Sequence, residues 1–206
     1  MSPDDATVPR ALGAAATLLA LGGIAVAILL DPTFSWTSDA LSDLGVRDRS
    51  ALVFNWGLIL GGVAGVGYAL GLWQSPTERG IAGATRTAVL ALAMVAMAGV
   101  GVFDLTEPLH APAALGFYIL VTVTFAVDGL ARRGTTSGRV ALAFVPVHVA
   151  VWATFAAGWW PVSGLALPEL PGALMLAAWV WVLGPSPVLG PVLDSGAPRR
   201  DGADGA

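Results

Sequence analysis

The chain has 206 residues, of which 56% are hydrophobic and only 12% are charged. With a mean hydropathy of +0.76, a water-soluble fold would have to bury more apolar surface than one core can hold, so the composition indicates a membrane protein. Fourteen acidic against ten basic residues give a net charge of -4, which excludes a general attraction to nucleic acid. The absence of cysteine excludes disulfides and thiolate chemistry.

Six apolar runs follow one another along the chain, separated by polar or Pro/Gly-rich breaks. Each is close to the roughly 20 residues that an α-helix needs to cross the hydrocarbon core of a bilayer. The sequence therefore predicts an all-α, polytopic transmembrane bundle of six helices that occupies residues 1–193. The predicted spans are residues 11–30, 51–72, 87–103, 111–130, 140–160 and 171–189.

The sixth predicted span is the least regular, because Pro185, Pro187 and Pro191 lie in or just after its apolar run. Each proline lacks a backbone N–H, so we expect this helix to be either short or kinked there. The segment 194–206 is rich in Gly, Ala and Asp and has no apolar run that could offset the entropy of ordering it. We predict that it is a disordered cytoplasmic tail.

The basic residues, all arginines, are distributed unevenly over the predicted connections. If the N-terminus is cytoplasmic, only Arg47 and Arg49 of the ten lie on the far side of the membrane. Short cytoplasmic segments retain positive charge during insertion. This bias predicts a multi-pass protein of the cell membrane, in contact with membrane lipid, with both termini in the cytoplasm.

Gly57, Gly61 and Gly65 recur at four-residue spacing in the second span and therefore lie on one face of the helix. Small residues in such a stripe let two helices approach closely, so packing within the chain is one interpretation. The other is a homodimer formed through the same three glycines, which could supply the second half of a small transporter.

The connection between the first two spans is rich in carboxylates and hydroxyls, including Ser42 and Asp43. Asn55 lies about one turn inside the second span, where its amide can hydrogen-bond to this connection and hold it over the helix ends. We predict an outer polar cap here that binds a small molecule, an ion or a lipid. Capping of a short helix and simple solvation explain the same residues, so both interpretations stay open.

The second outer connection adds Asp104, Glu107 and His110 at three-residue spacing. On a helical turn they would share a face, where carboxylates and an imidazole can bind a cation or shuttle protons, whereas a loop around Pro108 would separate them. The candidate ligand-binding residues of the cap are accordingly Ser42, Asp43, Asn55, Asp104 and His110.

Two ionisable side chains are predicted inside the later spans. His148 lies near the middle of the fifth span, where an imidazole is costly unless it is paired. Together with His110 and an aspartate it could hold a metal ion in a lipid hydrolase, and a hydrogen bond to a neighbouring helix is the alternative. Asp128 precedes Arg132 by four residues, which predicts an ion pair. No cofactor is predicted, because nucleotide and P-loop signatures are absent.

Three features recur together in one known family: the Ser-Asp-Leu-Gly element at 42–45, the Phe-Asn pair at 54–55 followed by Gly57, and His110 before the fourth span. By these features the chain resembles the prokaryotic membrane protein family called domain of unknown function 998, and it is distantly similar to Frag/DRAM/Sfk-type membrane proteins. The resemblance implies a polytopic fold with no established activity. It marks Ser42, Asp43, Gly45, Asn55 and His110 as positions expected to matter.

Overall fold

The computed structural model describes residues 7–74 and 80–194. Within them the chain forms long helices and no strand, and six helical segments are apolar and long enough to cross a membrane. The predicted all-α, polytopic bundle is therefore confirmed, while residues 195–206 of the predicted tail lie outside the described residues. The helices are α1 (Thr7–Leu30), α2 (Ala51–Gln74), α3 (Ile81–Val102), α4 (His110–Ala131), α5 (Thr136–Ala156) and α6 (Ala166–Ala178).

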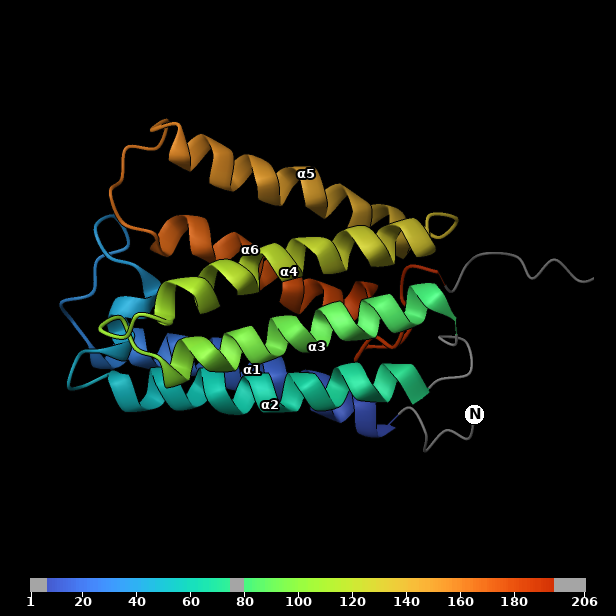
Figure 1. Cartoon of the computed structure of the whole chain (residues 1–206), viewed down its shortest axis with the longest axis horizontal. Helices are drawn as coiled ribbons and strands as arrows, with labels where there is room; N and C mark the ends of the chain where they lie inside the picture. Colours follow the sequence, from blue (N-terminus) through green and yellow to red (C-terminus); the bar gives the residue numbers. More distant parts are fainter. Residues whose placement is uncertain (1–6, 75–79, 195–206) are drawn as a thin grey trace, which may run out of the picture.

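Consecutive helices run in opposite directions along the bundle (Figure 1). Each of the first four helices packs on the next, and α5 lies along one edge, mainly against α4. The connections 31–50, 103–109 and 157–165 therefore meet at one end of the bundle, which we call the cap end. The start of α1 at Thr7 and the last described residue, Asp194, lie at the opposite end, which we call the terminus end.

The glycine stripe of α2 packs within the chain. A Cβ atom at Gly57 would lie 2.8 Å from the carbonyl oxygen of Leu19, and one at Gly61 would lie 2.9 Å from the carbonyl oxygen of Ala16. A Cβ at Gly65 would overlap the side chain of Met94 on α3. The close packing expected of the stripe thus joins α1, α2 and α3. A homodimer through the same glycines stays a prediction, and it would require these contacts to open.

The last span begins earlier and ends earlier than the apolar run indicated. Helix α6 starts at Ala166, with Pro168 in its first turn, where the missing N–H costs no hydrogen bond. After Ala178 the helix widens into a π-helical turn, η4 (Trp179–Leu183), and stops at Gly184 just ahead of Pro185. The span is therefore short, one of the two forms expected from its prolines.

Candidate functional site

The connection between α1 and α2 contains a short 3-10 helix, η2 (Leu41–Gly45), at the cap end. Two side chains hold it in place. The Asn55 amide on α2 donates from Nδ2 to the carbonyl oxygen of Gly45 at 2.9 Å, and the Ser50 hydroxyl donates to the carbonyl oxygen of Leu44 at 2.8 Å. The anchoring hydrogen bond predicted for Asn55 is confirmed.

Arg47 joins two carboxylates of the same connection. Its guanidinium lies 2.9 Å from Oδ2 of Asp31 and 2.8 Å from Oδ2 of Asp39. The Thr33 hydroxyl and Arg47, which both donate to Asp31, lower the pKa of that carboxyl to about 2. The backbone N–H of Ser35 and Arg47 likewise lower the pKa of Asp39. Both aspartates are therefore ionised at neutral pH and engaged in holding the connection together.

The connection between α5 and α6 is tied to this same segment by its backbone. The N–H groups of Ser163 and Gly164 both donate to the carbonyl oxygen of Thr37 at 3.0 Å, and the N–H of Ala166 donates to that of Asp39 at 2.9 Å. These bonds fix the first turn of α6 beside η2.

Glu169 lies in that first turn and reaches η2 with its carboxylate. Its Oε2 accepts from the backbone N–H of Leu41 at 2.8 Å, and the side chain is buried. In the described part of the chain, no arginine or histidine forms an ion pair with it. The N-terminal end of α6 favours a negative charge there. On η2 itself, Asp43 accepts from the Ala40 N–H at 2.7 Å and so caps the 3-10 turn.

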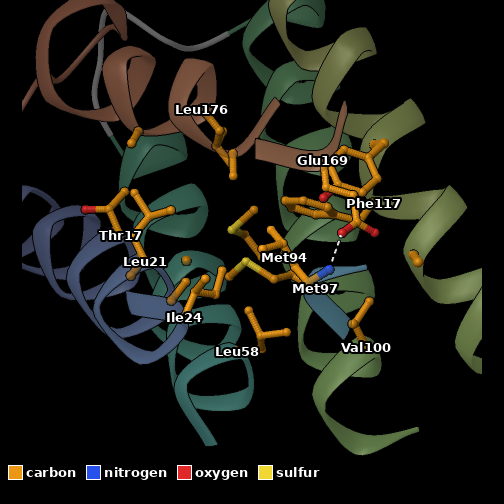
Figure 2. A pocket seen from close by; sticks show the side chains of 18 of the residues that line it. Thr17, Leu21, Ile24, Leu58, Met94, Met97, Val100, Phe117, Glu169 and Leu176 are labelled. Carbon is orange, nitrogen blue, oxygen red and sulfur yellow. Dashed lines mark hydrogen bonds between the residues drawn. The ribbon is translucent and has the colours of Figure 1, made fainter. Parts of the chain in front are cut away.

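Inside the bundle, η2 and Glu169 border a cavity whose other walls come from α1, α2, α3, α4 and α6 (Figure 2). The volume open to the centre of a water-sized sphere is about 80 Å³. On the same measure one water molecule needs about 10–15 Å³, so the cavity is several times larger than a single water site. Its lining runs from residue 16 to 24 on α1 and from 90 to 100 on α3. At 1.5 Å per residue these stretches are about 12 and 15 Å long, so the cavity is long and narrow. Its apolar wall includes Leu21, Leu58, Met94, Met97, Phe117 and Leu176.

The cavity has polar groups at both ends. Towards the terminus end, the Thr17 hydroxyl accepts from Nε1 of Trp181 at 2.7 Å, and the Tyr68 hydroxyl donates to the carbonyl oxygen of Ser186 at 3.3 Å. Towards the cap end, Glu169 and the buried Ser42 contribute to the lining. Ser42 is thus the predicted ligand-binding residue that borders the cavity.

The second connection does not join this lining. Asp104 accepts from the hydroxyl and the backbone N–H of Thr106 at 2.6 and 2.9 Å, and these bonds lower its pKa. His110 donates from Nδ1 to the carbonyl oxygen of Phe103 at 2.7 Å and thereby closes the turn before α4. Glu107 is exposed in that turn. The helix begins only at His110, so the three residues take the loop arrangement rather than one helical face.

At the terminus end, the fully buried Asp128 receives donors from three helical segments. Arg86 on α3 pairs with its Oδ1 at 2.9 Å, Arg132 pairs with both of its oxygens, and Trp179 in η4 donates to Oδ2 at 2.7 Å. Arg132 also donates to the carbonyl oxygen of Leu183 at 2.6 Å. The Asp128–Arg132 ion pair predicted from their spacing is confirmed. The other two donors belong to segments far away in the sequence.

His148 on α5 is buried and bonded through both ring nitrogens. The Thr122 hydroxyl donates to the carbonyl oxygen of Tyr118 at 2.8 Å, so the Nδ1 atom of His148, 2.8 Å from that hydroxyl, must carry the proton. The Nε2 atom then accepts from Nε1 of Trp152 at 3.2 Å. The bond to Thr122 of α4 is the interhelical hydrogen bond that is the expected alternative to a metal site.

No group of three His, Asp or Glu side chains in the described residues could hold a metal ion. His110 and His148 bind different partners, a carbonyl oxygen before α4 and side chains of α4 and α5. A metal site built on the two histidines stays a prediction, and the described residues offer no third ligand beside either histidine.

Glu169 is the residue of this site that the sequence interpretation missed. A predicted span beginning at residue 171 leaves Glu169 in the connection before it. The available signal was Pro168 followed by an acidic residue, a pattern typical of a first helical turn. Its partner Leu41 is 128 residues away in sequence, and no local pattern indicates that contact.

A comparison with family models matches residues 14–185 to the family described as "Protein of unknown function (DUF998)". The match extends from the first turns of α1 to just beyond η4, so it includes the cavity and the cap. No curated protein and no solved structure matches the chain.

Proposed function

The chain belongs to the DUF998 family, whose description names no activity, and we propose from its own geometry that this multi-pass membrane protein binds an amphiphile with a single alkyl chain. The alkyl chain occupies the central cavity, and the polar group of the ligand lies at the cap end beside Ser42. The observation that carries the proposal is the combination of a long apolar wall with the carboxylate of Glu169 and the hydroxyl of Ser42 at its cap end.

The shape and chemistry of the wall favour an alkyl chain over other ligands. An apolar cavity stays dry and takes apolar guests, and the bilayer around this protein consists of alkyl chains. The narrow space extends about 12 to 15 Å along α1 and α3, which suits one extended chain rather than a compact ring system. Met94 and Met97 line it from α3, and their flexible thioethers adapt to a guest more easily than branched side chains do.

The outer polar cap then acts as the closure of the cavity. Asn55 and Asp43 hold η2, and η2 supplies Ser42 to the lining. We keep Asp104 and His110 in the proposed cap because their connection lies at the same end of the bundle as η2. If the arginine bias sets the orientation, the polar group of the ligand faces the outer side of the cell membrane.

The sequence left two alternatives, a metal-dependent lipid hydrolase and a small dimeric transporter. Among residues 7–74 and 80–194 no cluster of metal ligands supports the first, and the glycines proposed for the dimer of the second pack against α1 and α3. Binding without catalysis therefore stands as the proposal.

Photolabelling in native membranes tests it. Dodecanol that carries a diazirine on its chain is added to the membranes, which are then illuminated. The sites where the probe has attached are mapped by mass spectrometry. We expect labels on cavity residues such as Met97 and Leu176. The variant Ala173→Phe fills the cavity from α6 and is expected to lower that labelling by about tenfold, a loss of roughly 1.4 kcal/mol in binding. Ala150→Phe, on an exposed face of α5, should leave it unchanged.

The contrary result is equally clear. Labels confined to lipid-facing side chains such as Leu174 and Val63, with the same pattern in wild type and Ala173→Phe, would mean that the cavity takes no alkyl chain.

A further inference from the structure

We infer that the amphiphile bound by this protein is cationic, and that Glu169 recognises an ammonium group at the head of its alkyl chain. This inference rests on the proposed function, because it names the chemical class of ligand for the same cavity. It concerns a carboxylate that contributes to the lining of the cavity at the cap end (Figure 2).

Glu169 has binding capacity left after its contact with η2. Its Oε2 accepts one hydrogen bond from the Leu41 N–H, drawn as the dashed line in Figure 2. A carboxylate offers about four lone-pair positions on two oxygens. The residue is only 7% exposed and borders the cavity, so the remaining positions are open to a group inside the cavity rather than to bulk solvent. A buried carboxylate within a membrane span is costly unless a complementary group meets it, and such residues mark ligand paths.

The charges around Glu169 select against an anionic head group. The connection 31–50 holds four aspartates and two arginines, a net charge of -2. Arg47 already forms ion pairs with both Asp31 and Asp39, so its single positive charge is balanced by two carboxylates. No cation in the described residues pairs with Glu169 itself. A phosphate or sulfate at this end would therefore meet negative charge, whereas an ammonium group would be attracted.

The hydrogen-bonding groups also match an ammonium. An alkylammonium has three N–H donors and no acceptor. Glu169 accepts at one side, and the buried hydroxyl of Ser42, which lines the same end of the cavity, can accept as well. The apolar wall then holds the carbon chain.

Competition against the dodecanol photolabel tests this inference in native membranes. Unlabelled dodecylamine and dodecanol are each titrated against cavity labelling in wild type, in Glu169→Gln and in the matched control Glu107→Gln, whose side chain is exposed. We take the ratio of the two half-competing concentrations and compare it between variants, because membrane partitioning of each competitor cancels in that comparison. Glutamine retains the acceptor for the Leu41 N–H, so η2 is expected to stay in place.

We expect the ratio of the half-competing concentration of dodecylamine to that of dodecanol to be about tenfold lower in wild type and in Glu107→Gln than in Glu169→Gln. A hydrogen bond to a charged group is worth about that factor. Equal ratios in all three proteins would overturn the cationic ligand and leave the alkyl-chain site standing. Stronger competition by dodecyl sulfate than by dodecylamine would also overturn it. Absence of cavity labelling in wild type would remove both the site and the inference.

A second measurement separates lipid from free amphiphile as the source of the ammonium. A lysolipid with an ethanolamine head group and one with a glycerol head group are compared as competitors. Preference for the ethanolamine lysolipid that disappears in Glu169→Gln supports recognition of a lipid amine, and preference for dodecylamine alone supports a simple alkylamine. Indifference to both amines contradicts the inference.

Discussion

Asp128 shows what a single ionisable side chain requires in this bundle. Its two oxygens receive donors from Arg86, Arg132 and Trp179, and so they join α3, α4 and η4 at one point. A carboxylate without such donors would be expensive away from water. Arg86 is itself only 2% exposed, so its contact with Asp128 is made away from solvent.

Asp128→Asn is expected to destabilise the protein by about 3–5 kcal/mol, the usual cost of removing one member of a buried ion pair. The asparagine oxygen can still accept from Trp179, but the negative charge that Arg86 and Arg132 both contact is removed. Reversible unfolding in mixed micelles measures the change. Asp48→Asn, at an exposed position, should alter stability by less than about 0.5 kcal/mol. A similar loss in both variants would assign the effect to something other than the buried network.

Whether a residue's partner could be predicted depends on how far away the partner lies in sequence. Asp128 and Arg132 are four residues apart, so their spacing indicated the pair, and the position of Asn55 at the start of α2 indicated a bond to the preceding connection, where Gly45 lies 10 residues before it. Glu169 bonds to Leu41 across 128 residues. That contact exists only because the α5–α6 connection returns to the cap end, which is a property of the whole bundle.

Two helices begin before the limits of their apolar runs. Helix α5 begins at Thr136, before the predicted start at residue 140, because the Thr135 hydroxyl accepts from the Gly138 N–H at 3.0 Å. Asp194 also accepts from the Thr136 N–H at 2.9 Å. Helix α3 begins at Ile81 rather than at residue 87, although its N-cap Gly80 offers no side-chain cap. Its first turns carry Arg86 into the bundle, whereas hydropathy placed this arginine outside the span.

Packing of α1 on α2 gives a test at the level of the elements. Gly57→Ala would place a methyl group 2.8 Å from the backbone oxygen of Leu19, and backbone cannot move aside cheaply. We expect a loss of about 1–3 kcal/mol, as for other overpacked sites.

The matched control is Gly22→Ala on α1, where no heavy atom lies within 4 Å of the added Cβ. Alanine is the better helix former there, so this variant should be neutral or stabilise by up to about 1 kcal/mol. Unfolding in mixed micelles measures both variants. If Gly57→Ala were as stable as Gly22→Ala, the two helices would have to be further apart than described.

At the scale of the molecule, the alternating direction of the helices determines which connections share a side of the membrane. Hydropathy predicted the number of spans, because each apolar run must become a closed helix in lipid. It could not predict the cavity, which forms where side chains of five helices fail to fill the space between them. The orientation relative to the cell still rests on the arginine bias alone.

Because the chain has no cysteine, single cysteines can report that orientation directly. We expect Glu107→Cys, at the cap end, to react in intact cells with a maleimide that does not cross membranes. Gly134→Cys, an open position at the terminus end, should react only after the cells are permeabilised. The reverse pattern would place both termini outside and would contradict the positive-inside assignment.

The short last span has a consequence for the lipid around the protein. Helix α6 and η4 together provide 18 residues, about 27 Å of helix, whereas the 24 residues of α1 provide about 36 Å. A bilayer core is about 30 Å thick, so the short span favours local thinning beside α6, whereas α1, whose first turn carries Arg10, can tilt or extend that turn into the head-group region; each adjustment costs a fraction of a kcal/mol per Å. The protein is therefore wedge-shaped in its hydrophobic thickness. Shorter-chain lipids are expected to gather on its α6 side, where membrane composition can bias how the bundle tilts.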